Sequence, residues 1–400
     1  MTARRAVAVL FLLNAVAYAN VVPRLPAIKA ELGLSNTSLG AAIAAVPVGA
    51  LLSGPIAGWL VARVGSGRLA TGCGVAFGLV LPCFALAPAW SALAAAFLVY
   101  GSFDSLMDVS MNAHALRVQR GWGRSIINSL HGLWSVGAVV GGIAGAAAGA
   151  AGISLELHLA VAGAVIIVTA LLTRRWLLPG HDSISDDAAP SAVHATAAAG
   201  GDAPRRATHR LVLLGLVVVM AAAVEDAPAS WGAVLLRTEL GTSVAAAGLV
   251  YLGFQTMMTL GRLSGDRIVD RFGEVAVVRA GGLLTAASVG SGLAIGEPAT
   301  IIVGFSLAGL GTAPLFPLVF HAAGDVPGVS TGHGVAAVAW MGRIGFLVAP
   351  PFVGLVGDAL NLRLALVVVP VAGVVIALLA GVLGDDRAGV REAGVREAGG

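Results

Sequence analysis

Five charged residues stand inside long apolar segments of the sequence: Asp104, Asp108, Glu225, Asp226 and Arg343. A charge in an apolar environment is costly, so such residues mark a path for ions or substrates by default. A carboxyl group in this setting can take up and release a proton, and a guanidinium can bind a carboxylate or a phosphate. The four acids are therefore candidates for proton coupling, and the arginine is a candidate for binding an anion.

A histidine in the next apolar segment could work with these acids. If each segment is one helix, a rise of about 1.5 Å per residue places His131 at roughly the depth of Asp108. A carboxylate beside an imidazole is a good proton carrier, because each group changes the proton affinity of the other. A fixed hydrogen bond between the two helices is the alternative interpretation for Asp108. The position of Asp104, nearer the centre, favours a functional role.

Glu225 and Asp226 are consecutive, so their side chains point about 100° apart around a helix. We expect one of them to face a cavity and the other to be paired or protonated. Pro228 follows and should break the helix there. For Arg343 we favour an ion pair with one of these two acids over the binding of a substrate anion.

Polar and aromatic residues near these charges are candidates for lining a substrate cavity. Asn112 continues the helical stripe formed by Asp104 and Asp108. Trp231 has two interpretations, and we favour an aromatic belt at the membrane surface over a platform for the substrate. The cavity candidates are Asn112, Asn128, Trp134, Trp231 and Arg343.

The composition indicates which elements position these residues. Apolar residues make up 58% of the 400 residues, charged residues 11%, and the mean hydropathy is +0.91, whereas a soluble domain carries about 25% charged residues. These values exclude an ordinary water-soluble enzyme, a disordered chain and a nucleic-acid binder. A helix needs about 20 apolar residues to cross a bilayer. Twelve such runs occur, at about 6–28, 38–62, 67–88, 91–116, 125–149, 154–178, 210–235, 243–265, 275–295, 299–322, 334–357 and 362–384.

The twelve runs form two sets of six with a polar stretch between them. We predict an N-terminal six-helix bundle over residues 1–180, a cytoplasmic linker over 181–209 and a C-terminal six-helix bundle over 210–384. The linker is rich in Ala, Gly, Asp and Pro, as flexible connections are. Residues 385–400 repeat Ala-Gly-Val-Arg-Glu and are predicted to form a disordered tail. Gly and Pro are frequent between residues 304 and 317, which predicts a discontinuous tenth helix.

Positive charge is distributed unevenly between the two ends of the predicted helices. With a cytoplasmic N-terminus, 19 of the 24 arginines and lysines lie on the cytoplasmic side and Arg343 lies within a helix. Only Arg24, Lys29, Arg237 and Arg363 lie outside. Because the cytoplasmic loops of membrane proteins carry the excess of Lys and Arg, we expect both termini and the linker in the cytoplasm.

Two short loops repeat one pattern in the two halves. Residues 58–65 read GWLVARVG and residues 266–273 read DRIVDRFG, an offset of 208 that pairs Arg63 with Arg271 and Gly65 with Gly273. A basic turn at the same place in each half indicates two parallel six-helix repeats, which is a known transporter architecture.

The two loops resemble the loop motif of the major facilitator superfamily, a glycine, three residues and then Asp-Arg-x-Gly. With the twelve helices and the long linker, the resemblance covers the whole chain. The first copy has Ala62 in place of the acid, and the second has Asp266 in place of the glycine but keeps Asp270. In the family this acid helps to hold one side of the transporter closed, so the resemblance assigns that role here to Asp270 and Arg271. The gating-loop candidates are Gly58, Arg63, Gly65, Asp266, Asp270, Arg271 and Gly273.

Four stretches carry a finer resemblance: DVSMN at 108–112, NSLHGLWS at 128–135, GRLSGDRIVDRFG at 261–273 and GFLVAPPFVG at 345–354. They are similar to a bacterial branch of the superfamily that is related to fucose permeases. This resemblance implies a small polar solute, such as a sugar, as the substrate.

We therefore expect a monomeric, all-α transporter of the cytoplasmic (inner) membrane that takes up a small polar solute with protons by alternating access. Proton-driven export of amphiphilic compounds is the alternative, and a non-transporting membrane sensor is a remote one. The sequence has no G-x-x-x-x-G-K-[ST] motif and no Cys/His spacing typical of a metal site. The expected partners are the solute, protons and lipid, with no cofactor, no metal, no nucleic acid and no enzymatic activity.

Overall fold

The computed structural model describes residues 2–123, 126–180 and 203–384 of the chain. Within these residues the fold is all-helical, and twelve helical segments are long and apolar enough to cross a membrane, as predicted. The N-terminal half contains α1 (Ala3–Val21), η1 (Val22–Arg24), α2 (Leu25–Glu31), α3 (Asn36–Ile43), α4 (Ala45–Val64), α5 (Ser66–Leu86), α6 (Trp90–Trp122), α7 (Ile127–Ala150) and α8 (Leu155–Arg174).

The C-terminal half repeats this arrangement with more interruptions. It contains α9 (Ala203–Ala227), η3 (Pro228–Gly232), α10 (Ala233–Thr238), α11 (Val244–Phe272), α12 (Glu274–Ile295), α13 (Pro298–Thr312), α14 (Leu315–Gly324), α15 (Thr331–Ala359), α16 (Leu362–Ala365), α17 (Val368–Leu379) and η4 (Ala380–Leu383). Helix α9 begins at Ala203, so residues 203–209 of the predicted linker are helical instead. The rest of that linker and the predicted tail lie outside the described residues.

Three helix ends follow directly from local sequence. Ser35 accepts a hydrogen bond from the backbone N–H of Ser38 and so starts α3, as serine does at many helix N-termini. Gly65 and Gly273 end α4 and α11 with φ values of 92° and 79°, a region that L side chains rarely adopt. The two predicted loop repeats are therefore the same sharp turn in each half.

Two helices are broken in the C-terminal half, as the sequence predicts. Pro228 opens a short π-helix between α9 and α10, because it cannot continue the backbone hydrogen-bond ladder. The tenth span is interrupted between α13 and α14, at Pro314. Glycines elsewhere allow two helices to pack closely. The Cβ positions at Gly137 and Gly141 of α7 would each lie 2.7 Å from a backbone oxygen of α1, which supports close packing as their role.

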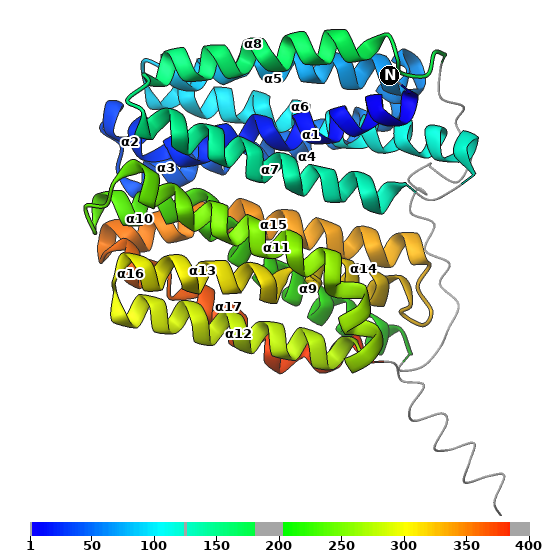
Figure 1. Ribbon diagram of the computed structural model, residues 1–400. Coiled ribbons are helices and arrows are strands. Elements are labelled where there is room, and N and C mark those ends of the chain that lie inside the picture. Colours follow the sequence, from blue (N-terminus) through cyan, green and yellow to red (C-terminus); the bar gives the residue numbers. More distant parts are fainter. Residues whose placement is uncertain (1, 124–125, 181–202, 385–400) are drawn as a thin grey trace, which may run out of the picture.

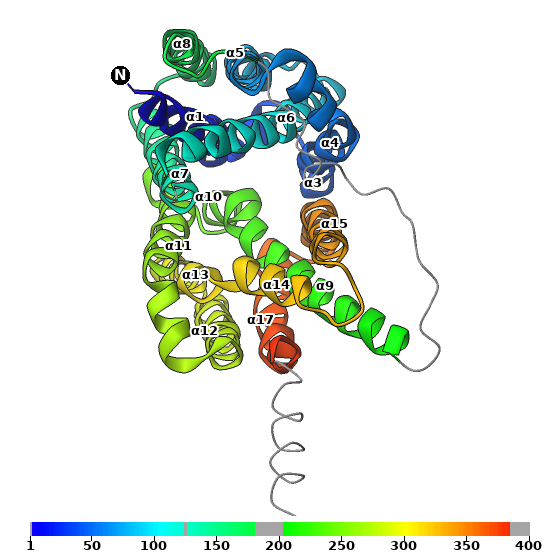
Figure 2. The ribbon, with the colours of Figure 1, turned by 90° about the vertical axis from the view of Figure 1, so that its right-hand side faces the viewer.

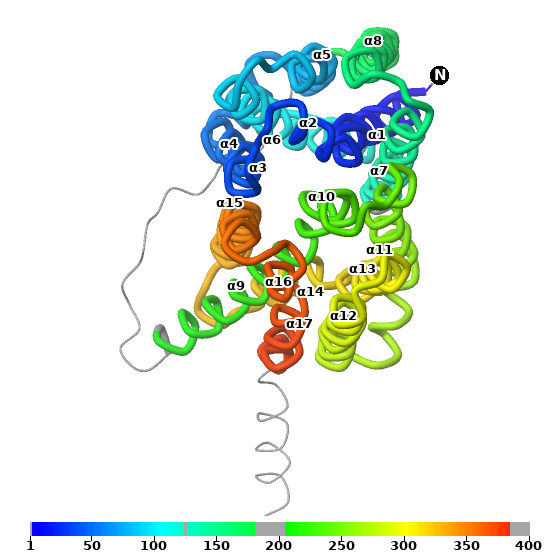
Figure 3. Tube along the Cα trace, turned by 90° about the vertical axis from the view of Figure 1, so that its left-hand side faces the viewer, coloured from blue at the N-terminus to red at the C-terminus, as the bar shows by residue number. Residues whose placement is uncertain are grey.

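The two halves lie one above the other, the N-terminal half in blue to green and the C-terminal half in green to red (Figure 1). We call the face with the start of α1 and the end of η4 the terminal face, and the opposite face, with α2, α10 and α16, the distal face. Views onto the terminal face (Figure 2) and the distal face (Figure 3) show α3 beside α15 and α7 beside α11. These two helix pairs join the halves.

The joints between the halves lie toward the distal face. The Asp358 carboxylate at the end of α15 accepts the backbone N–H groups of Asn36 and Thr37 at the start of α3, at 2.8 and 2.7 Å. At the other joint, the Cβ position of Gly149 on α7 would lie 2.7 Å from Val244 of α11. The structure is therefore closed at the distal face.

Candidate functional site

Asp104 is held in a hydrogen-bonded chain that links three helices of the N-terminal half. The Asn14 amide on α1 donates to Asp104 Oδ1 on α6 at 2.8 Å, and Trp134 Nε1 on α7 donates to Asn14 Oδ1 at 2.7 Å. The amide of Asn14 thus donates a hydrogen bond to Asp104 through its nitrogen and accepts one from the Trp134 indole through its oxygen. This chain fixes the orientation of a carboxylate inside a spanning helix.

Two tyrosines, Tyr18 and Tyr100, lie near this acid, and Tyr251 of α11, the third tyrosine of the chain, lies near both of them. The rings of Tyr18 and Tyr100 lie 5.6 Å apart. Tyr18 lies near Asp104 of the N-terminal half and near Asp226 of the C-terminal half. The phenol group thus lies within the reach of acids from both halves, and we call Asp104, Asp226 and the three tyrosines the central cluster.

Glu225 and Asp226 have different partners, which agrees with their 100° separation. Asp226 is 8% exposed and its Oδ1 accepts from Ser230 of the π-helix at 2.7 Å, while Oδ2 has no hydrogen-bond partner in the described part of the chain. Glu225 Oε1 lies 3.6 Å from Arg262 Nη2 of α11. The indole of Trp231 is fully buried, so the interpretation of this residue as part of an aromatic belt is wrong.

A second polar layer lies nearer the terminal face. Asp108 Oδ1 accepts from Asn112 Nδ2 at 3.0 Å, and the charges of His131 and Arg343 act on this acid from two other helices. Asp108 is exposed although protein groups surround it, so its exposed surface faces the space between the halves rather than lipid. Phe11 packs edge-on against His131, with 5.3 Å between the rings. Asp108 and His131 share one layer without a hydrogen bond between them among the described residues.

Arg343 does not form the ion pair that the sequence favoured. Neither acid lies within ion-pair distance of it: Glu225 lies 3.6 Å from Arg262, and Asp226 accepts a hydrogen bond from Ser230. The guanidinium points out of the C-terminal half instead, and its Nη1 lies 3.4 Å from the position of a Cβ at Gly54 in α4. The expected pairing is wrong because α15 presents this side chain to the N-terminal half, whereas α9 presents the two acids to α11 and to its own π-helix.

The remaining predicted residues have plainer surroundings. The side chain of Asn128 lies outside what the structure describes. Gly58 is exposed on α4, and Arg63 lies over the ring of Trp59 at 5.4 Å. In the second loop Asp266, Asp270 and Arg271 are exposed, and Arg271 lies over Phe272 at 5.5 Å. The gating role of the loops remains a prediction.

Sequence reasoning missed three groups in the site: Arg262, the Asn14 amide and the tyrosines. Arg262 stands in the stretch GRLSGDRIVDRFG at 261–273. The distribution of charge puts it on the cytoplasmic side, whereas α11 continues to Phe272. Asn14 and Tyr18 were available as polar residues in the first apolar run. Only the packing of α1 against α6 and α7 shows that they meet Asp104 and Trp134.

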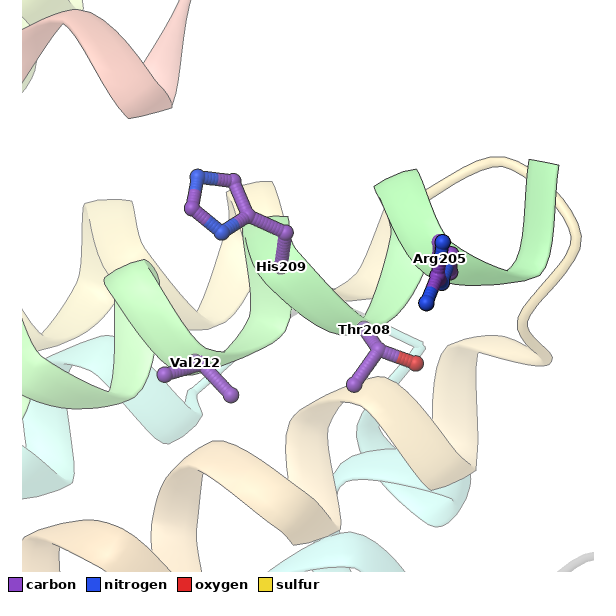
Figure 4. Close-up of a pocket in the computed structure, with 4 residues that line it drawn as sticks. All are labelled: Arg205, Thr208, His209 and Val212. Carbon is purple, nitrogen blue, oxygen red and sulfur yellow. The ribbon is translucent and has the colours of Figure 1, made fainter. Parts of the chain in front are cut away.

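Two further regions carry no comparable chemistry. Arg205, Thr208, His209 and Val212 line a shallow hollow on the first turns of α9 (Figure 4). Sixteen residues separate His209 from Glu225, or about 24 Å along the helix, so this hollow is remote from the central cluster. In the described residues no three His, Cys, Asp or Glu side chains are grouped as they would be around a metal ion.

Comparison with known proteins agrees with this architecture. The sequence model of the Major Facilitator Superfamily matches residues 7–234 and 211–398. An uncharacterized MFS-type transporter of Yersinia pestis is 31% identical over 343 residues, 86% of each chain. An uncharacterized transporter of Sinorhizobium fredii is 31% identical over 384 residues, 96% of this chain and 98% of the relative.

Solved transporters share the fold at low sequence identity. The nucleoside transporter NupG superposes with a TM-score of 0.75 at 14% identity, covering 96% of this chain and 99% of that one. A D-xylose-proton symporter superposes with a TM-score of 0.71 at 14% identity, covering 94% and 96%. With the sequence model matching both halves and two relatives 31% identical across most of the chain, this protein belongs to the major facilitator superfamily.

Proposed function

We propose that the protein is a proton-coupled secondary transporter that takes up a small polar solute by alternating access. The observation that carries the proposal is the central cluster, in which Tyr18 lies within the reach of one acid from each half. A residue between two rocking halves can pass a change in protonation or ligand binding from one to the other. The fold shared with a nucleoside transporter and a sugar-proton symporter supports a polar solute.

The orientation follows from charge. We place the terminal face at the cytoplasmic side of an inner membrane, because most of the arginines in the described residues lie at the helix ends and turns of this face. With the distal face closed by Asp358 and by the packing of α7 on α11, the structure then corresponds to an inward-facing state. We propose that the protein acts as a monomer, and that it belongs to the branch related to fucose permeases.

Uptake into vesicles tests this function. Purified protein is reconstituted and given a panel of radiolabelled sugars, sugar acids and nucleosides, with and without a pH gradient that is acidic on the distal side. We expect at least one solute to accumulate only with the gradient, and Asp226→Asn to abolish that accumulation. Expulsion of an amphiphilic dye by the same gradient, without solute uptake, would favour the exporter. No movement of any compound would favour the non-transporting sensor.

A further inference from the structure

A water-accessible arginine in the middle of a membrane protein, between its two halves, needs an anionic partner. Arg343 lies about twelve residues into α15, a helix of 29 residues. It cannot lose its proton to escape the cost of its position. Within the described residues it makes no hydrogen bond and no ion pair. Its donors are therefore available to a ligand.

The surroundings of Arg343 leave room for one negative charge. Its Nη1 approaches Gly54, the Cβ position of which would lie 3.4 Å from Nη1 and 3.5 Å from Ser105 Oγ of α6. Asp108, one turn further along α6, is the acid whose charge reaches the guanidinium. Asp108 is hydrogen-bonded by Asn112 and lies beyond ion-pair distance from Arg343. The two charges act on each other through space, but Asp108 does not occupy the donors of Arg343.

The other basic groups of this layer limit the charge of the ligand. Arg262 is ion-paired with Glu225 at 3.6 Å, whereas Arg343 has no acid within ion-pair distance among the described residues. A guanidinium matches the two oxygens of a carboxylate in a bidentate arrangement. One free arginine suits a monoanion better than a phosphate ester with nearly two negative charges. Asn112 and His131 add polar groups in the same layer for the hydroxyls of a solute.

From this geometry we propose that Arg343 binds the carboxylate of the transported solute, and that the substrates are hydroxylated monocarboxylates such as sugar acids. This inference rests on the proposed transport function and deepens it by naming the substrate class. A carboxylate bound to Arg343 would lie between the halves, because Arg343 belongs to α15 of the C-terminal half and faces α4 and α6 of the N-terminal half. A neutral sugar would leave the guanidinium without a partner.

Binding to matched pairs of solutes tests the inference. The melting temperature of the purified full chain is measured with D-galactose and D-galacturonate, D-glucose and D-glucuronate, and L-fucose and L-fuconate. We expect the acid of at least one pair to raise the melting temperature and its neutral partner to have no effect. Arg343→Gln should weaken binding of that acid by about tenfold or more, and Arg343→Lys should recover part of it.

A variant that fills the proposed binding space tests the inference without removing the charge of Arg343. Gly54→Val fills the space beside Nη1 and should weaken binding of the acid, whereas Gly72→Val, at a position with nothing within 4 Å of a Cβ, should not. If no acid raises the melting temperature, or if Arg343→Gln leaves its binding unchanged, the inference is wrong. Gradient-driven uptake of neutral solutes alone would overturn the substrate class and leave the transport function intact, whereas no uptake of any solute would overturn the transport function.

Discussion

Asp104 is the acid whose neutralisation should separate proton coupling from folding. Asn14 and Trp134 hold its carboxylate in place, and an amide of the same size keeps the packing while it removes the titratable proton. We predict that Asp104→Asn folds and exchanges solute across the membrane but no longer accumulates it in a pH gradient. Asp325→Asn, on an exposed loop, is the control. Driven accumulation that survives in Asp104→Asn would remove this acid from the proton path.

The pair formed by Arg262 and Glu225 should stabilise the C-terminal half. Its side chains are 32% and 17% exposed, so we expect Arg262→Gln to cost about 1–3 kcal/mol, less than the loss of a fully buried pair. Arg262→Gln with Glu225→Gln should recover much of this loss, because no unpaired carboxylate remains. The free energies of unfolding of the two single variants and the double variant, measured in a denaturing detergent, form a double-mutant cycle that gives the coupling between the two residues. A similar coupling between Arg343 and Glu225 would restore the pairing that the structure contradicts.

Individual charged residues could be found from the sequence, but their partners could not. Asp104, Asp108 and Arg343 stood out because a charge within an apolar run is costly. Which acid faces which base depends on how each helix is rotated. Depth estimates assume helices that end at the membrane surface. Helix α11 has 29 residues and extends to Phe272. Arg262 therefore lies within a helix, ten residues before its end, rather than in a loop.

At the scale of helices, the carboxylate of Asp358 acts as a clasp between α15 and α3. It accepts two backbone N–H groups of the opposite half, and hydrogen bonds to a charged group are worth about 1.5–3 kcal/mol each when shielded from water. We predict that Asp358→Ala loosens the distal closure. The readout is a cysteine at Val244, in a chain with Cys73 and Cys83 replaced by alanine. Because Asp358 is exposed, we expect the loss of its hydrogen bonds to cost about 1 kcal/mol. This cysteine should then react about fivefold faster with a membrane-impermeant thiol reagent.

Glu297→Ala is the matched control, because Glu297 is an exposed acid on the same face. It stands at the N-cap position of α13, and its side chain makes no capping hydrogen bond. Equal labelling in Asp358→Ala and the unmodified protein would show that the carboxylate does not hold the halves together.

Helices were more predictable than their interruptions. The twelve apolar runs and the glycine-ended turns at Gly65 and Gly273 follow from residue type alone. Pro228 predicts a break in the helix. That the break is a π-helix, in which Ser230 donates a hydrogen bond to Asp226, depends on the packing around it. Helix α9 begins at Ala203 although the sequence around Arg205 is polar, because a helix can continue beyond its apolar run into solvent.

At the scale of the whole molecule, the distribution of arginine predicts the orientation in the membrane. We predict that a phosphatase reporter, active only outside the cytoplasm, is silent when fused near Ala197. The same reporter inserted between α7 and α8, at Gly152 on the distal face, should be active and serves as the control. Activity at Ala197 would reverse the orientation and the assignment of an inward-facing state.

Rocking of the two halves is the central claim, and paired distance measurements test it most directly. Spin labels at Ala30 and Leu360 span the halves at the distal face, and labels at Arg68 and Asp325 span them at the terminal face; all four positions are exposed. In lipid nanodiscs, a solute that the vesicles accumulate should lengthen the first distance and shorten the second in the same population of molecules. Two distances that stay fixed, or that change in the same direction, would contradict alternating access.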